Sequence, residues 1–237
     1  MIAVGIDVSK SKDGKFYVFH PGMEPHHLYH MEHIRKMTSE EISHLRYVNY
    51  DRTYTQFGVN TLDELLESFK GRCYINVDKF WGHPKEIYEA IKRHGMTDQI
   101  LVKSAPSDKV FEVLEEVAPE LPYLPIVKNE HPMHERLLRS NINYIGAEVL
   151  FVKDDATVAS PEFIDMMHRD GKLVWVNSII YNYKDQLAAG HSDDTALCGD
   201  PELGWGWLAK RGFDFIQTDW TMMLVDYLKQ NGLLYRA

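Results

Sequence analysis

Cysteine is scarce in this chain: its 237 residues include two, Cys73 and Cys198. Two cysteines cannot build the disulfide framework that holds small secreted domains together. A chain of this length with 44% hydrophobic residues buries a large core and needs no such cross-link. Both thiols are therefore predicted to be reduced, which favours a cytoplasmic protein.

Positive charge is also in deficit. The chain carries 26 Lys and Arg against 35 Asp and Glu, a formal net charge of −9. A field of that sign repels nucleic acids and anionic membrane surfaces, so neither is expected as a partner. It also repels an anionic small molecule, unless cations at the binding site reverse the sign locally.

Several recognisable segments and motifs are missing as well. No run of 18 apolar residues is present, so no membrane-spanning helix is predicted. The N-terminal MIAVGIDVSK is too short and too soon charged for a signal peptide. No phosphate-binding loop, dinucleotide fingerprint or nucleophilic serine elbow occurs, which argues against the corresponding enzyme classes.

What the chain does contain is an alternation of short apolar runs with helical patterns. Such alternation predicts βα units and a parallel sheet. The candidate strands cover residues 2–8, 72–78, 99–103, 121–127, 143–151, 172–177 and 212–218. The candidate helices cover residues 61–69, 84–94, 107–117, 132–140, 161–170, 202–211 and 221–230.

This order of elements predicts an α/β fold of the TIM-type (β/α) barrel class. Such a barrel closes with eight strands, whereas seven are predicted, so the first βα unit is expected to be missing, either as a real loss or because the sequence starts late. We expect a single domain over residues 1–237. Residues 14–60 interrupt the repeat and are expected to form a hairpin and insertion over the catalytic face.

Residues 6–20, IDVSKSKDGKFYVFH, hold the densest group of candidate site residues. They predict a buried strand that ends in Asp7, a Lys-Asp-Gly turn, and a second strand that ends in His20. The two side chains then lie at neighbouring strand ends, where a carboxylate and an imidazole serve one substrate. The alternatives are a capping role for Asp7 and an ordinary surface position for His20.

Several phrases, in order, resemble the glycerophosphodiester phosphodiesterase family. They are Gly5-Ile6-Asp7-Val8, Lys12-Asp13-Gly14, Val18-Phe19-His20-Pro21, Asn60-Thr61-Leu62-Asp63-Glu64 and Asn76-Val77-Asp78-Lys79, then GKLVWVN and GFDFIQTDWTMMLVDYL. The resemblance runs from residue 5 to residue 228. It implies a metal-dependent barrel enzyme of lipid metabolism that hydrolyses a glycerophosphodiester to glycerol 3-phosphate and an alcohol.

The chain also departs from the family pattern. The opening strand with its His-Arg-Gly phrase is absent, Gly5 stands where the family has a metal-binding glutamate, and Pro21 follows His20 where aspartate is usual. The resemblance therefore implies a hydrolase that is impaired in this chain. The alternative is a non-catalytic or vestigial member of the family that binds phosphoesters.

The resemblance assigns the catalytic acid and base to His20 and the metal to Asp7 and Asp78. A divalent ion neutralises phosphate oxygens while an acid protonates the leaving alkoxide. Mg²⁺ or Ca²⁺ is expected, weakly held. One or two carboxylates suffice for Mg²⁺ beside a phosphate, whereas Ca²⁺ prefers more oxygens.

Three further residues are expected to bind phosphate or substrate. Lys79 and Lys103 lie at strand ends, where an ammonium group reaches a phosphate oxygen; for Lys103 a solvated position is equally open. Trp175 resembles the family's substrate-lining tryptophan, with a buried core position as the alternative. Glu148 stands in an apolar strand, and we expect it to form a structural ion pair.

The expected partner is thus a small-molecule phosphodiester. A second copy of the chain is a further candidate, because a barrel without its first unit leaves strand edges unpaired and allows a homo-oligomer to form through the open barrel seam.

Overall fold

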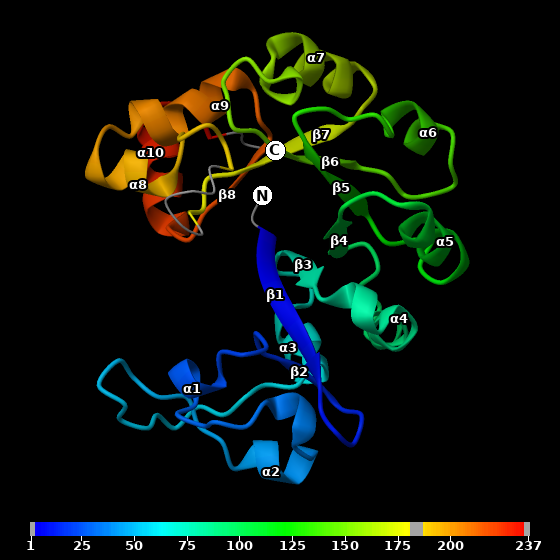
Figure 1. Cartoon of the computed structure of the whole chain (residues 1–237), viewed down its shortest axis with the longest axis vertical. Helices are drawn as coiled ribbons and strands as arrows, with labels where there is room; N and C mark the ends of the chain where they lie inside the picture. The colour runs from blue at the N-terminus through cyan, green and yellow to red at the C-terminus, as the bar shows by residue number, and fades with distance from the viewer. Residues whose placement is uncertain (1–2, 181–186, 235–237) are drawn as a thin grey trace. The chain divides into compact units, whose positions relative to one another are not determined.

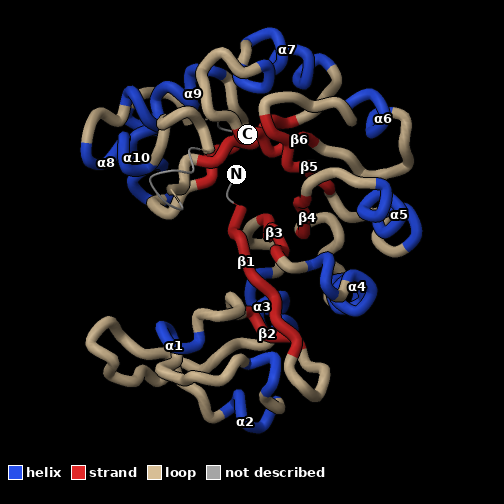
Figure 2. Tube along the Cα trace, viewed as in Figure 1, coloured by secondary structure: helices blue, strands red, loops and turns tan. Residues whose placement is uncertain are grey.

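The computed structural model describes residues 3–180 and 187–234. The chain divides into two compact units, whose helices and strands are labelled in Figure 1. Unit 1 comprises residues 1–102 and 112–122, and unit 2 comprises residues 103–111 and 123–237. Each unit combines parallel strands with helices, as the alternation in the sequence predicts (Figure 2).

The sheet of unit 1 has the strand order β2-β1-β3-β4. Its strands are β1 (Ala3–Lys10), β2 (Phe16–Val18), β3 (Tyr74–Asp78) and β4 (Ile100–Ser104), the last two residues of which belong to unit 2. β1 is antiparallel to β2 and parallel to β3, and β3 is parallel to β4. In this register Gly5 lies opposite Asn76 and Asp7 lies opposite Asp78.

Two helices of unit 1 follow the strands, α3 (Leu62–Phe69) and α4 (Pro84–Arg93). The start of α3 is set by a capping box. The Glu64 amide donates to the Thr61 hydroxyl, and the Thr61 amide donates to the Glu64 carboxylate at 2.8 Å. Both interactions use backbone amides that have no partner within the helix, which fixes where α3 begins.

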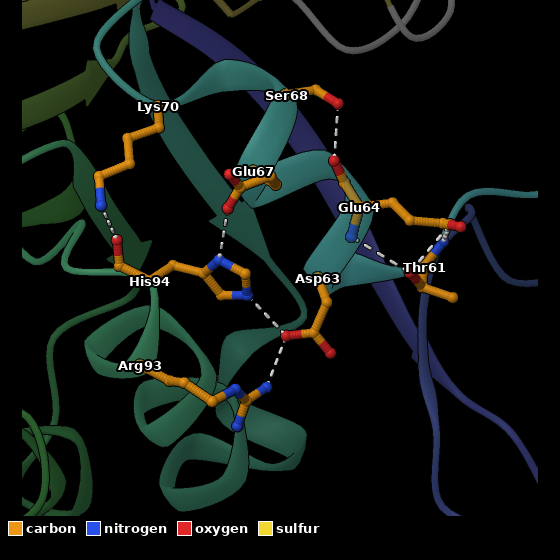
Figure 3. A network of polar contacts seen from close by, with 8 residues as sticks. All are labelled: Thr61, Asp63, Glu64, Glu67, Ser68, Lys70, Arg93 and His94. Carbon is orange, nitrogen blue, oxygen red and sulfur yellow. Dashed lines mark hydrogen bonds and ion pairs between the residues drawn. The ribbon is translucent and has the colours of Figure 1, made fainter.

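A polar network ties α3 to the end of α4 (Figure 3). Asp63 accepts hydrogen bonds from Arg93 at 2.5 Å and from His94 at 2.7 Å, and Lys70 donates to the His94 carbonyl at 2.6 Å. Burial raises the pKa of Asp63, but the hydrogen bonds from His94 and Arg93 outweigh it and hold that pKa below its ordinary value. The network thus anchors the helical layer with a carboxylate that stays ionised.

Residues 21–60 form a largely irregular excursion around two short helices (Figure 2), which shares a small core with β2 and the residue after it. It contains α1 (Glu24–His27), the 3₁₀ turn η1 (Ile34–Lys36) and α2 (Ser39–Ser43). The core consists of Tyr17, Phe19, Leu28, Ile34, Met37 and Ile42. Glu24 is fully buried beneath it and accepts hydrogen bonds from the amides of Gly22 and Ile34. Its carboxylate replaces the backbone partners that a regular strand or helix would supply.

Unit 2 contains four parallel strands in the order β5-β6-β7-β8. They are β5 (Tyr123–Lys128), β6 (Gly146–Leu150), β7 (Leu173–Asn177) and β8 (Phe215–Gln217). β6 can begin only with glycine, because a Cβ on Gly146 would collide with the backbone of Leu173 in β7.

The helices of unit 2 connect and follow these strands. They are α6 (His134–Leu138), the 3₁₀ turn η3 (Thr157–Ala159), α7 (Pro161–Arg169), α8 (Asp193–Cys198), the π-helical turn η4 (Glu202–Gly206), α9 (Trp207–Arg211) and α10 (Thr221–Gln230). α5 (Asp108–Glu116) is divided between the units, with residues 108–111 in unit 2.

All seven predicted βα-type strands are found among the described residues. Two predictions need correction. β1 does not end near Asp7 but continues to Lys10, because its last three residues pair with β2. β2 stops at Val18, so His20 follows the strand instead of ending it. The prediction of a single domain stays a prediction.

Candidate functional site

Asp7 and Asp78, the two predicted metal ligands, are lateral neighbours. They face each other in the register of the parallel strands β1 and β3. Laterally paired residues project to the same face of a sheet. Asp7 is half-buried and Asp78 is exposed, so the pair lies where a buried strand end meets solvent. Two carboxylates at one strand edge can face one cation.

Lys79 directly follows this pair and turns back toward it. Its backbone has φ +65°, a left-handed conformation that non-glycine residues rarely adopt. The chain bends here because the next residue, Phe80, is fully buried and starts the 3₁₀ turn η2 (Phe80–Gly82). The Lys79 ammonium consequently lies 3.6 Å from Oδ1 of Asp7. Backbone strain of this kind often accompanies a functional position.

The chain just beyond β2 places Phe19, the residue before His20, opposite Asp7. The Phe19 amide donates to the Asp7 carbonyl at 2.9 Å, and this hydrogen bond extends the antiparallel pairing of β1 and β2 by one residue pair. The His20 ring is exposed, and its Nδ1 lies 3.0 Å from the Pro21 carbonyl. Because a carbonyl only accepts hydrogen bonds, Nδ1 carries the proton in the neutral ring and Nε2 keeps its lone pair.

Gly5 lies two residues before Asp7 and therefore on the same face of β1. A Cβ built at Gly5 meets nothing within 4 Å. Neither space nor backbone conformation thus requires glycine here. The open space beside Asp7 would accommodate a longer side chain.

The residues of this edge fit a weak magnesium site. Oδ1 of Asp7 is buried and has no hydrogen-bond partner among the described residues. Asp7 and Asp78 supply the one or two carboxylates with which Mg²⁺ is usually held, the rest of its shell being water and phosphate oxygens. No group of three or more His, Cys, Asp or Glu suited to a metal occurs in the described part of the chain. Calcium, which takes six to eight oxygens, fits this pair poorly.

A cleft of about 1050 Å³ opens from Asp78 and Lys79. Its lining residues are Val8, Lys10, Ser11, Lys12, Asp13, Gly14, Arg35, Asp78, Lys79, Trp81, Gly82 and His83. All of them belong to unit 1. The cleft has the size of a small-molecule site, and four of its side chains are those of lysine or arginine.

Lys103 belongs to unit 2 and is buried there. Its ammonium lies 2.7 Å from Oε2 of Glu148 and donates to Gln217 at 2.8 Å. Both charged side chains are 5% exposed, so the attraction between them offsets part of the cost of burying each charge. The structural ion pair predicted for Glu148 is confirmed, with Lys103 as its partner. The solvated position considered for Lys103 is wrong.

Trp175 is packed against the same group. It is 5% exposed, stacks on Phe215 with ring centroids 5.1 Å apart, and donates its indole N–H to Gln217 at 3.1 Å. The Lys103 ammonium lies 4.3 Å above its ring. Trp175 thus occupies the buried core position that the sequence left open.

The sequence analysis assigned no role to two members of this buried group. Asn177 donates to Oε1 of Glu148 at 3.2 Å, and Gln217 joins Lys103 to Trp175. The available signal was a polar residue at the end of each apolar strand. The spacing along the chain gives no indication that strands so far apart in sequence share one polar group.

The comparisons with known proteins begin with a family model. Residues 123–228 match a family described as a domain of unknown function. No curated protein matches the chain.

Solved structures, by contrast, resemble almost the whole chain. A glycerophosphoryl diester phosphodiesterase from Parabacteroides distasonis matches with a TM-score of 0.74 and 17% identity, over 97% of this chain and 76% of that one. A glycerophosphodiester phosphodiesterase from Agrobacterium tumefaciens matches with a TM-score of 0.64 and 20% identity, over 92% and 83% of the two chains. The chain has the glycerophosphodiester phosphodiesterase fold. The predicted fold class, an α/β fold of the TIM-barrel type, is thereby confirmed.

A third structure with this fold carries a ligand. It is a phosphodiesterase from Oleispira antarctica in complex with the product sn-glycerol-3-phosphate, with a TM-score of 0.63, 18% identity, and 97% of this chain and 85% of that one covered. None of the described helices in the present chain is long and apolar enough to cross a membrane.

Proposed function

We propose that this chain hydrolyses a glycerophosphodiester to glycerol 3-phosphate and an alcohol, with a weakly held magnesium ion. The observation that carries the proposal is the strand register. It sets Asp7 opposite Asp78, while the backbone bond from Phe19 to Asp7 holds His20 at the next strand. The shared fold supports the same activity, since the matching structures are named as phosphodiesterases.

His20 supplies the proton chemistry in this proposal. Its Nδ1 proton is directed to the Pro21 carbonyl, which leaves Nε2 facing solvent as the reacting nitrogen. Protonated at Nε2, the ring donates a proton to the leaving alkoxide; neutral, it accepts one from the attacking water. One histidine performs both steps in turn, so turnover is expected to be slow.

Asp7 and Asp78 hold the magnesium ion in the proposed enzyme. When bound, the ion neutralises the non-bridging phosphate oxygens and makes the phosphorus more electrophilic. Lys79 contributes a second positive charge beside Asp7, and its exposed ammonium binds a phosphate oxygen at the mouth of the cleft. That Lys103 and Trp175 contact the substrate stays a prediction from the sequence; in unit 2 the charge of Lys103 is matched by Glu148.

A second candidate function is the binding of phosphoesters without hydrolysis. Two observations favour it. Gly5 leaves Asp7 as the one carboxylate on its strand face, and the nearest cation to Asp7 is the chain's own Lys79. Such a site would still bind the phosphate of a phosphoester but would hold a metal ion only weakly.

Hydrolysis of glycerophosphocholine in Mg²⁺, Mn²⁺, Ca²⁺ or EDTA tests the proposal. Feeble turnover is expected in Mg²⁺, and Asp7→Asn and His20→Gln should each abolish it. His44→Gln is a matched control, because His44 is also an exposed histidine of unit 1 and lies outside the cleft. Turnover that survives both site substitutions would remove these residues from the chemistry. Binding of the substrate without any turnover would favour the second candidate.

The cytoplasmic location and the homo-oligomer remain proposals of the sequence analysis. Light scattering at several protein concentrations tests the second of them.

A further inference from the structure

The cleft of unit 1 carries less negative charge than the chain as a whole. The chain carries a net charge of −9. The cleft is lined by four cations, Lys10, Lys12, Arg35 and Lys79, and by two carboxylates, Asp13 and Asp78. Glu86 pairs with Lys10 and Asp7 with Lys79, so cations and carboxylates balance there. A concave surface without net negative charge admits anions that the rest of the molecule repels.

Two of the four cations have no ion-pair partner among the described residues. Lys10 is paired with Glu86 at 3.0 Å, and Lys79 lies beside Asp7. Lys12 and Arg35 form no ion pair within 4 Å with any residue that the structure describes, although Lys12 attracts the Glu41 carboxylate electrostatically. Both cations can therefore meet an anionic ligand in the cleft.

The wall that carries Lys12 and Arg35 is fixed by a carboxylate. Asp13 accepts hydrogen bonds from the Ser11 hydroxyl at 2.6 Å and from the amide and hydroxyl of Ser39, each at 3.0 Å. These bonds hold the pKa of Asp13 at about 2, so the anchor stays ionised. The Lys12 amide also donates to the Met37 carbonyl at 2.8 Å, just beyond η1. The hairpin turn and η1 are thus held together as one basic wall.

The cleft also has an apolar side. Val8, Trp81 and Gly82 line it, and apolar and aromatic surface of this kind packs against a carbon skeleton such as a polyol ring. The cleft therefore combines Asp78 and Lys79 of the proposed site with apolar surface and two cations that have no ion-pair partner in the described part of the chain.

We propose that Lys12 and Arg35 form a subsite for a phosphate carried by the alcohol moiety of the substrate. The preferred substrate is then a glycerophosphodiester whose head group bears a phosphomonoester of its own. This inference rests on the proposed function for the bond that is cleaved. The cleft volume of about 1050 Å³ suits a small head group of this kind.

A matched substrate pair tests the subsite. Glycerophosphoinositol and glycerophosphoinositol 4-phosphate differ in one phosphomonoester. For the wild-type chain, kcat/KM is expected to be about tenfold higher for the phosphorylated compound, about threefold for each exposed cation that meets its phosphate. In Lys12→Ala/Arg35→Ala this ratio should fall to about one. Lys36→Ala is the control, because Lys36 is the exposed neighbour of Arg35 in η1, does not line the cleft, and should keep the ratio.

Direct binding separates this inference from the proposed hydrolysis. The affinity of both compounds is measured by calorimetry under conditions without turnover, at low salt and at about 0.5 M salt, where surface attraction is largely screened. Tighter binding of the phosphorylated compound, lost in the double variant and at high salt, supports the subsite even when neither compound is hydrolysed. Equal binding of the two compounds overturns the subsite, whether or not both are cleaved. An unchanged ratio in the double variant overturns it as well.

Discussion

Gly5→Glu is the substitution that tests the proposed magnesium site most directly. Gly5 and Asp7 share one face of β1, and a side chain at Gly5 meets no atom within 4 Å of its Cβ. Replacing a glycine inside a strand removes an entropic penalty of about 0.5–1 kcal/mol. The cost is electrostatic: two carboxylates about 6.6 Å apart along a strand repel each other by about 2.5 kcal/mol near a protein surface. Without metal, the variant should therefore be less stable than the wild type by about 1.5–2 kcal/mol.

Magnesium should change this balance. With Mg²⁺ at about 100 times its dissociation constant, binding stabilises the folded state by about 2.7 kcal/mol. For a chain of this size, that corresponds to an increase of about 5–10 °C in melting temperature. The variant is expected to reach this increase at millimolar Mg²⁺, whereas the wild type, with fewer carboxylates, needs more. Hydrolysis of glycerophosphocholine should rise in the same range of Mg²⁺ concentration.

Thermal unfolding in EDTA and in a series of Mg²⁺ concentrations measures the effect. Gly5→Gln is the control, because it has the same size and no charge. If Gly5→Glu responds to Mg²⁺ no more than Gly5→Gln does, the edge formed by Asp7 and Asp78 is not a site for a divalent ion. The proposal of metal-dependent hydrolysis would then be refuted together with it.

Three further predictions concern stability. Lys103→Met should lower the free energy of unfolding, measured in urea, by about 3–5 kcal/mol, because it leaves Glu148 buried without a counter-charge. The double variant Lys103→Met/Glu148→Leu should lose much less. Equal losses in the two variants would show that the two side chains are not coupled. Burial and the neighbouring His134 lower the pKa of His131 to about 4, below the 6.5 of a free histidine, so the folded state favours its neutral form. The associated stability, at most about 3 kcal/mol, is present above pH 6.5 and is lost as the pH falls toward 4, and His131→Gln should flatten that part of the stability curve; an unchanged slope would contradict it. Gly146→Ala should lower the melting temperature by several degrees, because its Cβ collides with the β7 backbone, and a neutral result would show that β6 and β7 separate easily.

The strands were predictable because burial on both faces gives them continuous apolar runs. The short helices α1, α2 and α8 were not predicted, since four to six residues are too few to show a helical period. The stretch 202–211 was predicted as one helix but begins as a π-helical turn, η4. Glycines at 204 and 206 allow that turn, because a Cβ at either would collide with neighbouring atoms.

The site was predictable in part. The phrases around Asp7 and Asp78 indicated strand ends, but their lateral pairing depends on the register, which local sequence does not determine. The return of Lys79 toward Asp7 depends on a left-handed backbone that a lysine rarely adopts, so no propensity could indicate it. The partner of Glu148 lies 45 positions away along the chain, at Lys103, and only the folded sheet brings the two together.

The choice between hydrolysis and binding depends on whether Lys79 excludes a metal from Asp7. The Lys79 ammonium is 3.6 Å from Asp7, and its side chain is 45% exposed. Ion pairs of this exposure contribute about 0–1 kcal/mol. A magnesium ion at millimolar concentration needs only a modest affinity to exceed that, and a phosphate bound beside it gives the displaced ammonium a new partner. Lys79 is therefore too weak a competitor to make the site non-catalytic. The number of carboxylates beside Asp7 limits metal affinity, which is why the decisive position is Gly5 and not Lys79.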